Sequence, residues 1–388
     1  MTHPKVMVVY GTRPEAIKVA PVIRALQQDI RFNVIAVSTG QHREMLEQVN
    51  SKFGIQPKHD LEIMRDGQSL NGIISRVIEG LDRVIDAELP ELLLVHGDTS
   101  TAMAAALTAF NSRIPIGHIE AGLRSGSLFS PFPEEANRRV ISQLASLHLA
   151  PTEHARENLL SSGVSEKCVH VTGNTVIDAL LEATTWKTEF SDSRLNALST
   201  AQQRVVLVTT HRRENLAEMA SIGRALQSIA KANPDVCLVL PAHLNPRVRD
   251  AILPQIANVP NTIITDPLPY DEFTKLMSLA SVVLTDSGGI QEEAPALGKP
   301  VLVMRNNTER PEAVESGTVR LVGTSVQTII AETNRLLTDP DAYRDMAQAT
   351  NPYGDGNASF RIVQAIANYL LGDDRPAPFH PCGQETSG

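Results

Sequence analysis

The sequence predicts an α/β protein with two domains, each built on a parallel β-sheet. Three observations favour this class. Short runs of Val, Ile and Leu recur along the chain, helical patterns follow several of these runs, and 388 residues exceed the usual length of one domain. Several runs are apolar at consecutive positions, as strands buried on both faces of a parallel sheet require. A composition of 42% hydrophobic and 20% charged residues excludes disorder as the main state.

The expected elements alternate along the chain. Strands are expected over residues 6–10, 34–38, 92–96, 205–209, 236–240 and 282–285. Helices are expected over residues 16–28, 70–87 and 100–110. Alternating units of this kind join parallel strands through right-handed crossovers.

The strand–helix pattern pauses between Asn174 and Arg204, where a helix over 176–184 precedes a polar stretch. We therefore expect an N-terminal domain over residues 1–173 and a C-terminal domain over 174–358. A last helix over 359–371 is expected to pack back on the N-terminal domain, and the proline-rich tail, 372–388, to be disordered. Residues 92–99 and 282–289 resemble each other, as the same unit of two similar domains would, although chance similarity explains this equally well.

Charge and cysteine content narrow the function classes. Lys and Arg number 35 against 44 Asp and Glu, so the net charge is −9, and aromatic residues make up 4%. This balance argues against a nucleic-acid scaffold but leaves small anionic ligands open. Cys168, Cys237 and Cys382 are an odd number and far apart, which predicts neither disulfides nor a zinc site. Without a signal peptide or a long apolar run, we expect a soluble cytoplasmic protein.

A glycine-rich turn between an expected strand and helix is a candidate phosphate site. Ser287, Gly288 and Gly289 begin this helix, where free N–H groups attract phosphate oxygens, and Glu292 or Glu293 follows one turn later to bond ribose hydroxyls. A plain turn that needs glycine geometry is the alternative. The corresponding turn in the N-terminal domain, residues 11–15, matches neither a dinucleotide fingerprint nor a P-loop. It carries Arg13, and Lys18 follows in the expected helix. These two cations either bind an anion or are ordinary surface charges.

Three acidic residues lie near expected strand ends or helix starts: Asp98, Glu120 and Glu134. Strand ends of a parallel sheet converge on one edge, so these carboxylates can share a pocket and supply an acid and a base. The alternatives are a helix cap for Asp98 and a favourable first-turn charge for Glu134.

The C-terminal domain offers further polar groups at strand ends. His211 and Arg212 follow one expected strand, and His243 follows another. At these positions they could contact an anionic leaving group. The alternative for His211 and Arg212 is a solvated run of charges. The sequence has no serine-hydrolase elbow and no metalloprotease motif.

Taken together, these motifs resemble the non-hydrolysing UDP-N-acetylglucosamine 2-epimerases. The motifs run in family order over nearly the whole chain: GTRPE at 11–15 with Lys18, TGQH at 39–42, HGDT at 96–99, HIEAGLR at 118–124, PEEANR at 133–138, TGN at 172–174, HRREN at 211–215, and DSGG at 286–289 with EAP at 293–295. The resemblance implies two Rossmann-like domains of glycosyltransferase-B type facing a cleft, in a homodimer. It also implies reversible conversion of UDP-GlcNAc to UDP-ManNAc without metal or cofactor, which supplies ManNAc-type sugars for cell-surface polysaccharide.

The resemblance also implies residue roles. Asp98, Glu120 and Glu134 become acid–base groups, with His211 and Lys18 as further catalytic groups. UDP would be held by the following residues: Arg13, Arg212, His243, Ser287, Gly288, Gly289 and Glu293. Gln41 and His42 would belong to an allosteric site for a second UDP-GlcNAc, a feature of some members of the family. A glycosyltransferase, a hydrolysing epimerase and a non-catalytic UDP-sugar sensor are the rival functions.

Overall fold

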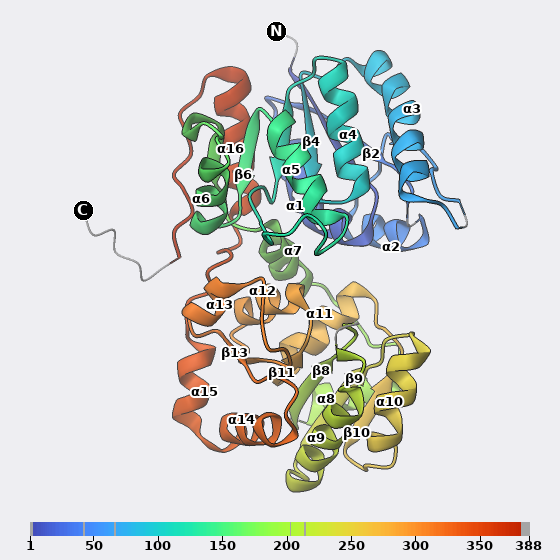
Figure 1. Ribbon diagram of the computed structural model, residues 1–388, viewed down its shortest axis with the longest axis vertical. Coiled ribbons are helices and arrows are strands. Elements are labelled where there is room, and N and C mark those ends of the chain that lie inside the picture. The colour runs from blue at the N-terminus through green and yellow to red at the C-terminus, as the bar shows by residue number, and fades with distance from the viewer. Residues whose placement is uncertain (1–2, 42, 66, 202, 213–214, 382–388) are drawn as a thin grey trace, which may run out of the picture. The chain divides into compact units, whose positions relative to one another are not determined.

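A computed structural model describes residues 3–41, 43–65, 67–201, 203–212 and 215–381. The chain forms two compact units (Figure 1). Unit 1 runs to Ala179 and includes Tyr353–His380, and unit 2 contains Leu180–Pro352. The division falls inside helix α7 (Thr175–Thr184), later than the expected boundary after residue 173. Residues 174–179 belong to unit 1 because they pack there: the backbone N–H of Asn174 donates to the Tyr353 carbonyl oxygen at 2.7 Å.

Unit 1 is built on a seven-stranded parallel sheet in the order β3-β2-β1-β4-β5-β6-β7. Its strands are β1 (Lys5–Tyr10), β2 (Asn33–Ser38), β3 (His59–Asp60), β4 (Leu92–His96), β5 (Ile116–Ile119), β6 (Leu147–Ala150) and β7 (Val169–Val171). The central strands β1 and β4 are almost wholly buried along their length, as their continuous apolar runs predict.

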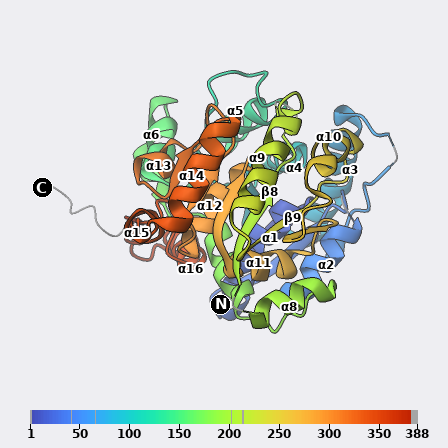
Figure 2. The ribbon, with the colours of Figure 1, turned by 90° about the horizontal axis from the view of Figure 1, so that it is seen from below.

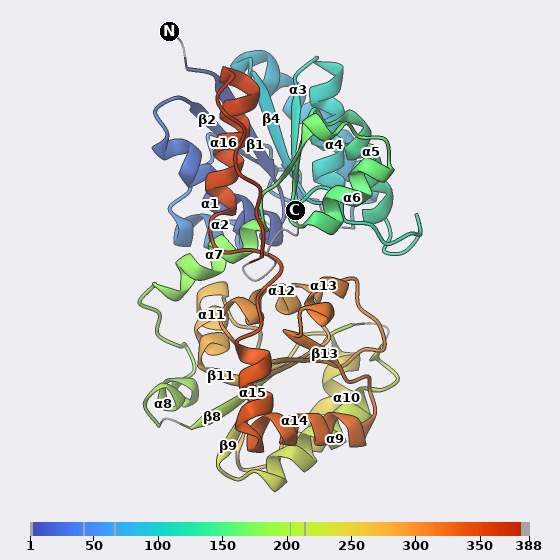
Figure 3. The same ribbon diagram turned by 90° about the vertical axis from the view of Figure 1, so that its left-hand side faces the viewer.

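Helices cover both faces of this sheet. Its helices are α1 (Arg13–Gln28), α2 (Arg43–Phe53), α3 (Leu70–Glu88), α4 (Ser100–Asn111), α5 (Glu134–Leu144), α6 (Glu153–Ser161) and α16 (Ala358–Leu371). Side chains of α3, α4 and α5 form one core with alternate residues of β1, β2 and β4. Helix α16 packs beside α1, which contacts β1 and β2 (Figure 3). The last helix thus returns the chain to unit 1.

The described part of the C-terminal tail is ordered, which corrects the expectation of disorder for 372–381. Phe379 is 4% exposed, its N–H donates to the Val171 carbonyl oxygen at 2.8 Å, and the Arg361 guanidinium lies over its ring. Asp373 pairs with Arg31. The prolines keep this segment extended, so it follows the exposed edge of β7 and bonds to its carbonyl groups. Residues 382–388, including Cys382, lie outside the described residues.

Unit 2 repeats the design with a six-stranded parallel sheet in the order β10-β9-β8-β11-β12-β13. Its strands are β8 (Arg204–Thr209), β9 (Val236–Pro241), β10 (Thr262–Thr265), β11 (Ala280–Thr285), β12 (Val301–Val303) and β13 (Val319–Leu321). The strands β4 and β11 occupy corresponding places in the two sheets. The two similar segments, residues 92–99 and 282–289, therefore begin with equivalent strands of the two units.

Helices also flank the sheet of unit 2. They are α8 (Ser193–Ala201), α9 (Met219–Ala232), α10 (Pro246–Ile256), α11 (Tyr270–Leu279), α12 (Gly288–Ala296), α13 (Pro311–Glu315), α14 (Val326–Thr338) and α15 (Pro340–Ala347). Helix α9 packs between α10 and α14, and these three share a core with β8, β9 and β11 (Figure 2). Among the described residues, no helix is long and apolar enough to cross a membrane.

Candidate active site

The turn between β1 and α1 is fixed by Glu15. Its Oε2 accepts the backbone N–H groups of Gly11 at 3.0 Å and Thr12 at 2.8 Å, and its Oε1 accepts the Thr99 hydroxyl at 2.6 Å. Glu15 therefore ties the turn after β1 to the turn after β4. A Cβ atom on Gly11 would lie 2.1 Å from Thr39 Oγ1, so close packing requires this glycine. The turn places Arg13 at the first position of α1 and Lys18 one turn and a half later.

Glu120 follows β5 in a conformation that side chains rarely adopt. Its φ is +62°, a left-handed backbone that costs about 1–3 kcal/mol. Its buried carboxylate pairs with Lys18 Nζ, and His96 Nε2 lies 3.3 Å from the same oxygen. Burial raises the pKa of Glu120, but the charges of Lys18 and His96 outweigh burial and hold this pKa well below its usual range. The carboxylate is thus kept ionised, and the local strain is of the kind found at functional sites.

Asp98 is held by the first turns of α5. Its Oδ2 accepts Arg138 Nε at 2.9 Å and lies 2.6 Å from Arg138 Nη2, and its backbone carbonyl accepts Asn137 Nδ2 at 2.8 Å. Thr99, and not Asp98, caps α4 through its hydroxyl. The alternative that Asp98 caps this helix is therefore wrong, and the Asp98 carboxylate is not needed as a cap.

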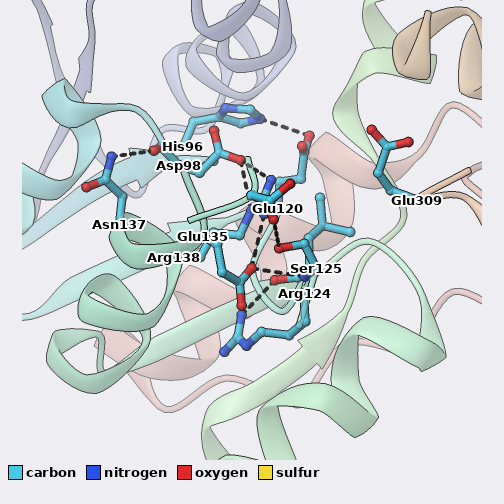
Figure 4. Close-up of polar contacts among 12 residues, drawn as sticks. His96, Asp98, Glu120, Arg124, Ser125, Glu135, Asn137, Arg138 and Glu309 are labelled. Carbon is cyan, nitrogen blue, oxygen red and sulfur yellow. Dashed lines mark hydrogen bonds and ion pairs between the residues drawn. The ribbon is translucent and has the colours of Figure 1, made fainter. Parts of the chain in front are cut away.

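Glu134 begins α5, three and four residues before Asn137 and Arg138, so it shares their side of the helix. Its Oε2 is buried and has no hydrogen-bond partner among the described residues. Asp98 and Glu120 follow the neighbouring strands β4 and β5, and Figure 4 shows them at this edge with His96. The structure brings the ends of β4 and β5 and the start of α5 to one edge of the unit 1 sheet.

In unit 2, buried Asp286 organises the turn after β8. Its carboxylate accepts the Thr210 hydroxyl at 2.8 Å, the N–H groups of His211 and Arg212 at 3.0–3.1 Å, and Asn215 Nδ2 at 3.2 Å. Asp286 follows β11, which pairs with β8. It therefore fixes the turn after β8 against the end of β11. The backbone at His211 and Arg212, the described part of the charge run given as the alternative, is thus anchored.

Two histidines are stacked in unit 2. The rings of His211 and His243 lie 5.7 Å apart at 19°, and His243 Nδ1 accepts the Asn245 N–H at 3.1 Å. Burial lowers the pKa of His211, with Arg212 and His243 acting in the same direction against the opposing charge of Asp286. His211 therefore favours the neutral form, which can accept a proton.

The N-terminus of α12 has the features of an anion site. Ser287 precedes the helix without capping it through its side chain. Neither Gly288 nor Gly289 has a positive φ, so the backbone conformation of the turn does not require glycine. A Cβ atom on Gly288 would lie 3.4 Å from Arg212 Nη2 and 3.7 Å from Arg310 Nη2. The glycines thus leave backbone N–H groups open beside two guanidinium groups, which favours phosphate over the plain-turn alternative.

The two helical glutamates of α12 differ in their surroundings. Glu292 is buried and its Oε1 accepts Arg310 Nε at 2.5 Å. Glu293 is half-buried, and its Oε1 would lie 3.2 Å from a Cβ atom on Gly289. Of the two, Glu293 therefore lies beside the glycine turn.

Of the residues expected in a regulatory site, only Gln41 is described, and its hydrogen-bond partner Thr101 lies beside Gly11. Gln41 Oε1 accepts the Thr101 hydroxyl at 2.7 Å, and His42 lies outside the described residues. In the part of the chain that the structure describes, no group of three or more metal-ligating side chains gathers.

Sequence reasoning did not single out Glu15, His96, Glu135, Arg138 or Arg310. All except Arg310 stand inside the motifs around the predicted residues, so the signal was present. The contacts that join them to the predicted site, such as His96 with Glu120 and Arg138 with Asp98, link residues distant in the chain, and only the fold reveals them.

Two parallel-sheet α/β units of matching strand order define the class of proteins with two Rossmann-like domains of glycosyltransferase-B type. The glycotransferase of kitacinnamycin has this fold, with a TM-score of 0.65 at 15% identity, covering 95% of this chain and all of that one. That likeness shows the fold alone.

The chain belongs to the UDP-N-acetylglucosamine 2-epimerase family, whose model matches residues 24–367. It is 51% identical to the UDP-N-acetylglucosamine 2-epimerase of Yersinia pestis, over 95% of this chain and 99% of the relative. It is also similar to the crystal structure of UDP-GlcNAc 2-epimerase from Neisseria meningitidis bound to UDP-GlcNAc, with a TM-score of 0.85 and 48% identity over 95% of this chain and 100% of the other. The chain is therefore an isomerase, an epimerase of UDP-GlcNAc.

Proposed function

We propose that the chain interconverts UDP-GlcNAc and UDP-ManNAc by eliminating and re-adding UDP. The observation that carries this proposal is the Glu120 carboxylate, kept ionised by Lys18 and His96 in a strained turn of unit 1. The open glycine turn of α12 in unit 2 supports it. Elimination needs both a proton acceptor and a held diphosphate.

The reaction inverts a carbon whose proton is not acidified by a neighbouring carbonyl group. A base removes the proton from C2, the C1–O bond breaks, and its electron pair leaves with UDP while a C1=C2 double bond forms in 2-acetamidoglucal. In the return step, UDP oxygen attacks C1 and an acid delivers a proton to the opposite face of C2. The two faces therefore require two separate acid–base groups.

Unit 1 would supply these groups. Glu120, which pairs with Lys18, and Asp98, which pairs with Arg138, would accept and deliver these protons. Glu134 offers a buried oxygen without a protein partner in the described structure. Lys18 would keep Glu120 charged and support the anions of the reaction.

Unit 2 would hold UDP. The N–H groups of Gly288 and Gly289 would bind the diphosphate with Arg212, while the N–H of Ser287 donates to the Thr285 hydroxyl at 2.9 Å and leaves the Ser287 side chain to contribute. The family resemblance assigns Arg13 to UDP as well. Glu293 would bond the ribose hydroxyls. His211 and His243 stack beside the turn that carries Arg212, and a neutral His211 would take part in catalysis near the leaving group.

We further propose a homodimer, a regulatory site that includes Gln41 and His42 for a second UDP-GlcNAc, and a role in supplying ManNAc-type sugars for cell-surface polysaccharide. These proposals rest on the family resemblance.

Proton NMR of the purified protein with UDP-GlcNAc in heavy water tests the reaction. Appearance of UDP-ManNAc, with deuterium at C2 of both epimers, is the expected result. Free ManNAc with UDP would show that water intercepts the glucal and would assign a hydrolysing enzyme. Binding without any turnover would leave a sensor, and sugar transferred to an added acceptor would indicate a glycosyltransferase.

A further inference from the structure

Glu135 is a fully buried carboxylate in the first turn of α5, next to Glu134. Its Oε2 accepts the Ser125 N–H at 3.0 Å and Arg138 Nη1 at 3.2 Å, while its Oε1 accepts Arg139 Nε at 2.9 Å. Burial raises the pKa of Glu135, but these hydrogen bonds and the Arg138 charge lower it more, so this pKa lies below its usual range. Glu135 is thus an anion in the interior, whose desolvation its partners must offset.

Arg138 joins Glu135 to Asp98. One terminal nitrogen of its guanidinium contacts Glu135, and the Nε and the other terminal nitrogen contact Asp98 Oδ2 (Figure 4). A guanidinium is planar and rigid, so fixing one edge on Glu135 fixes the direction of the other edge. The position of the Asp98 carboxylate therefore depends on Glu135, which does not touch it.

Glu135 also anchors the segment that leads from Glu120 to Glu134. Its bond to the Ser125 N–H holds this segment five residues after Glu120, and Ser125 Oγ donates to the Ser130 carbonyl oxygen at 2.6 Å. Pro133, at the N-cap of α5, makes no side-chain capping bond. Glu135 thus bonds to the segment after Glu120 as well as to the arginine that holds Asp98.

We propose that Glu135 is a positioning residue that aligns Asp98 through Arg138. This inference rests on the proposed function of Asp98 in proton transfer.

A double-mutant cycle of Glu135→Gln and Arg138→Gln tests the inference, with UDP-GlcNAc epimerisation as the assay. Misplacing a reacting group by about 1 Å can cost on the order of 100-fold, so we expect Glu135→Gln to lower kcat about 10- to 100-fold while KM changes less than about 3-fold. If Glu135 acts through Arg138, the same substitution made in Arg138→Gln lowers kcat less than about 2-fold further. If Glu135→Gln lowers kcat by the same factor in the wild-type protein and in Arg138→Gln, the inference is overturned.

Arg139→Gln is the matched control, because Arg139 contacts the other oxygen of Glu135, is half-exposed and, in the part of the chain that the structure describes, forms no ion pair with Asp98. It should keep kcat, and a loss as large as that of Glu135→Gln would indicate a packing role instead. Should Glu135→Gln fail to fold, Arg138→Lys keeps the charge but loses the planar fork, and unchanged kcat in that variant would reject the relay. Absence of turnover by the wild-type protein would reject the proposed function itself.

Discussion

At the scale of residues, the proposed acid–base groups of unit 1 differ in the side chains that contact them. Glu120 pairs with Lys18 and His96, and Asp98 with Arg138, while Glu134 keeps a buried oxygen without a partner in the described structure. Each pairing fixes the position of a carboxylate, which proton transfer to or from an unactivated carbon requires. The left-handed backbone of Glu120 costs local stability, and strain of this kind is concentrated at functional sites.

We expect Glu120→Gln and Asp98→Asn each to lower kcat at least about 100-fold, because an amide cannot accept the C2 proton. Binding of UDP-GlcNAc should be nearly kept, since other residues are proposed to hold UDP. Steady-state kinetics and calorimetry measure the two quantities. Glu157→Gln, an exposed position of α6, is the control, and turnover equal to that control in either variant would remove the carboxylate from the proposed role.

At the scale of elements, the start of α12 and the tail along β7 are the informative segments. The α12 turn carries glycines that its backbone conformation does not require, beside two arginines. The tail supplies hydrogen bonds and one buried ring to an edge strand.

Gly289→Val should abolish measurable UDP binding. The new side chain meets Glu293 Oε1 and crowds the N–H groups that would bind phosphate. Isothermal calorimetry with UDP gives the affinity. Gly72→Val in the first turn of α3 is the control, because it also places valine near the start of a helix. Undiminished UDP affinity in Gly289→Val would refute the phosphate site.

Phe379→Ala should lower the free energy of unfolding by about 3 kcal/mol, because it removes a buried ring. Phe360→Ala, a 61% exposed position on α16, should change it by less than about 0.5 kcal/mol. Urea unfolding of both variants measures the difference. Equal stabilities would mean that the tail contributes nothing to unit 1.

At the scale of the whole molecule, both units share one architecture, and buried histidines make the fold sensitive to acid. In unit 1, burial lowers the pKa of His118 to about 3 and that of His148 and His170 to about 4, from 6.5. Between these values and 6.5 the unfolded chain binds protons that the folded chain does not. These groups therefore reduce the free energy of unfolding as pH falls through this window.

His170→Gln should remove about 1.5 kcal/mol of the stability loss between pH 6.5 and pH 5. Urea unfolding of each variant at both pH values gives the change within that variant, so any constant effect of the substitution cancels. His154→Gln, with an exposed side chain on α6, should keep the wild-type pH dependence. If the stability of His170→Gln falls with pH as much as that of the wild-type protein, His170 has the same pKa in the folded and unfolded chains.

The sequence by itself determined the α/β class, the central strands and the places of Asp98, Glu120 and the α12 glycine turn. These features follow from local periodicity and from the rule that strand ends of a parallel sheet share one edge. Only the tertiary structure decided the pairings Lys18–Glu120 and Arg138–Asp98, the division inside α7 and the order of the tail. These depend on contacts between residues distant in the chain, and such contacts leave no periodic trace in the sequence.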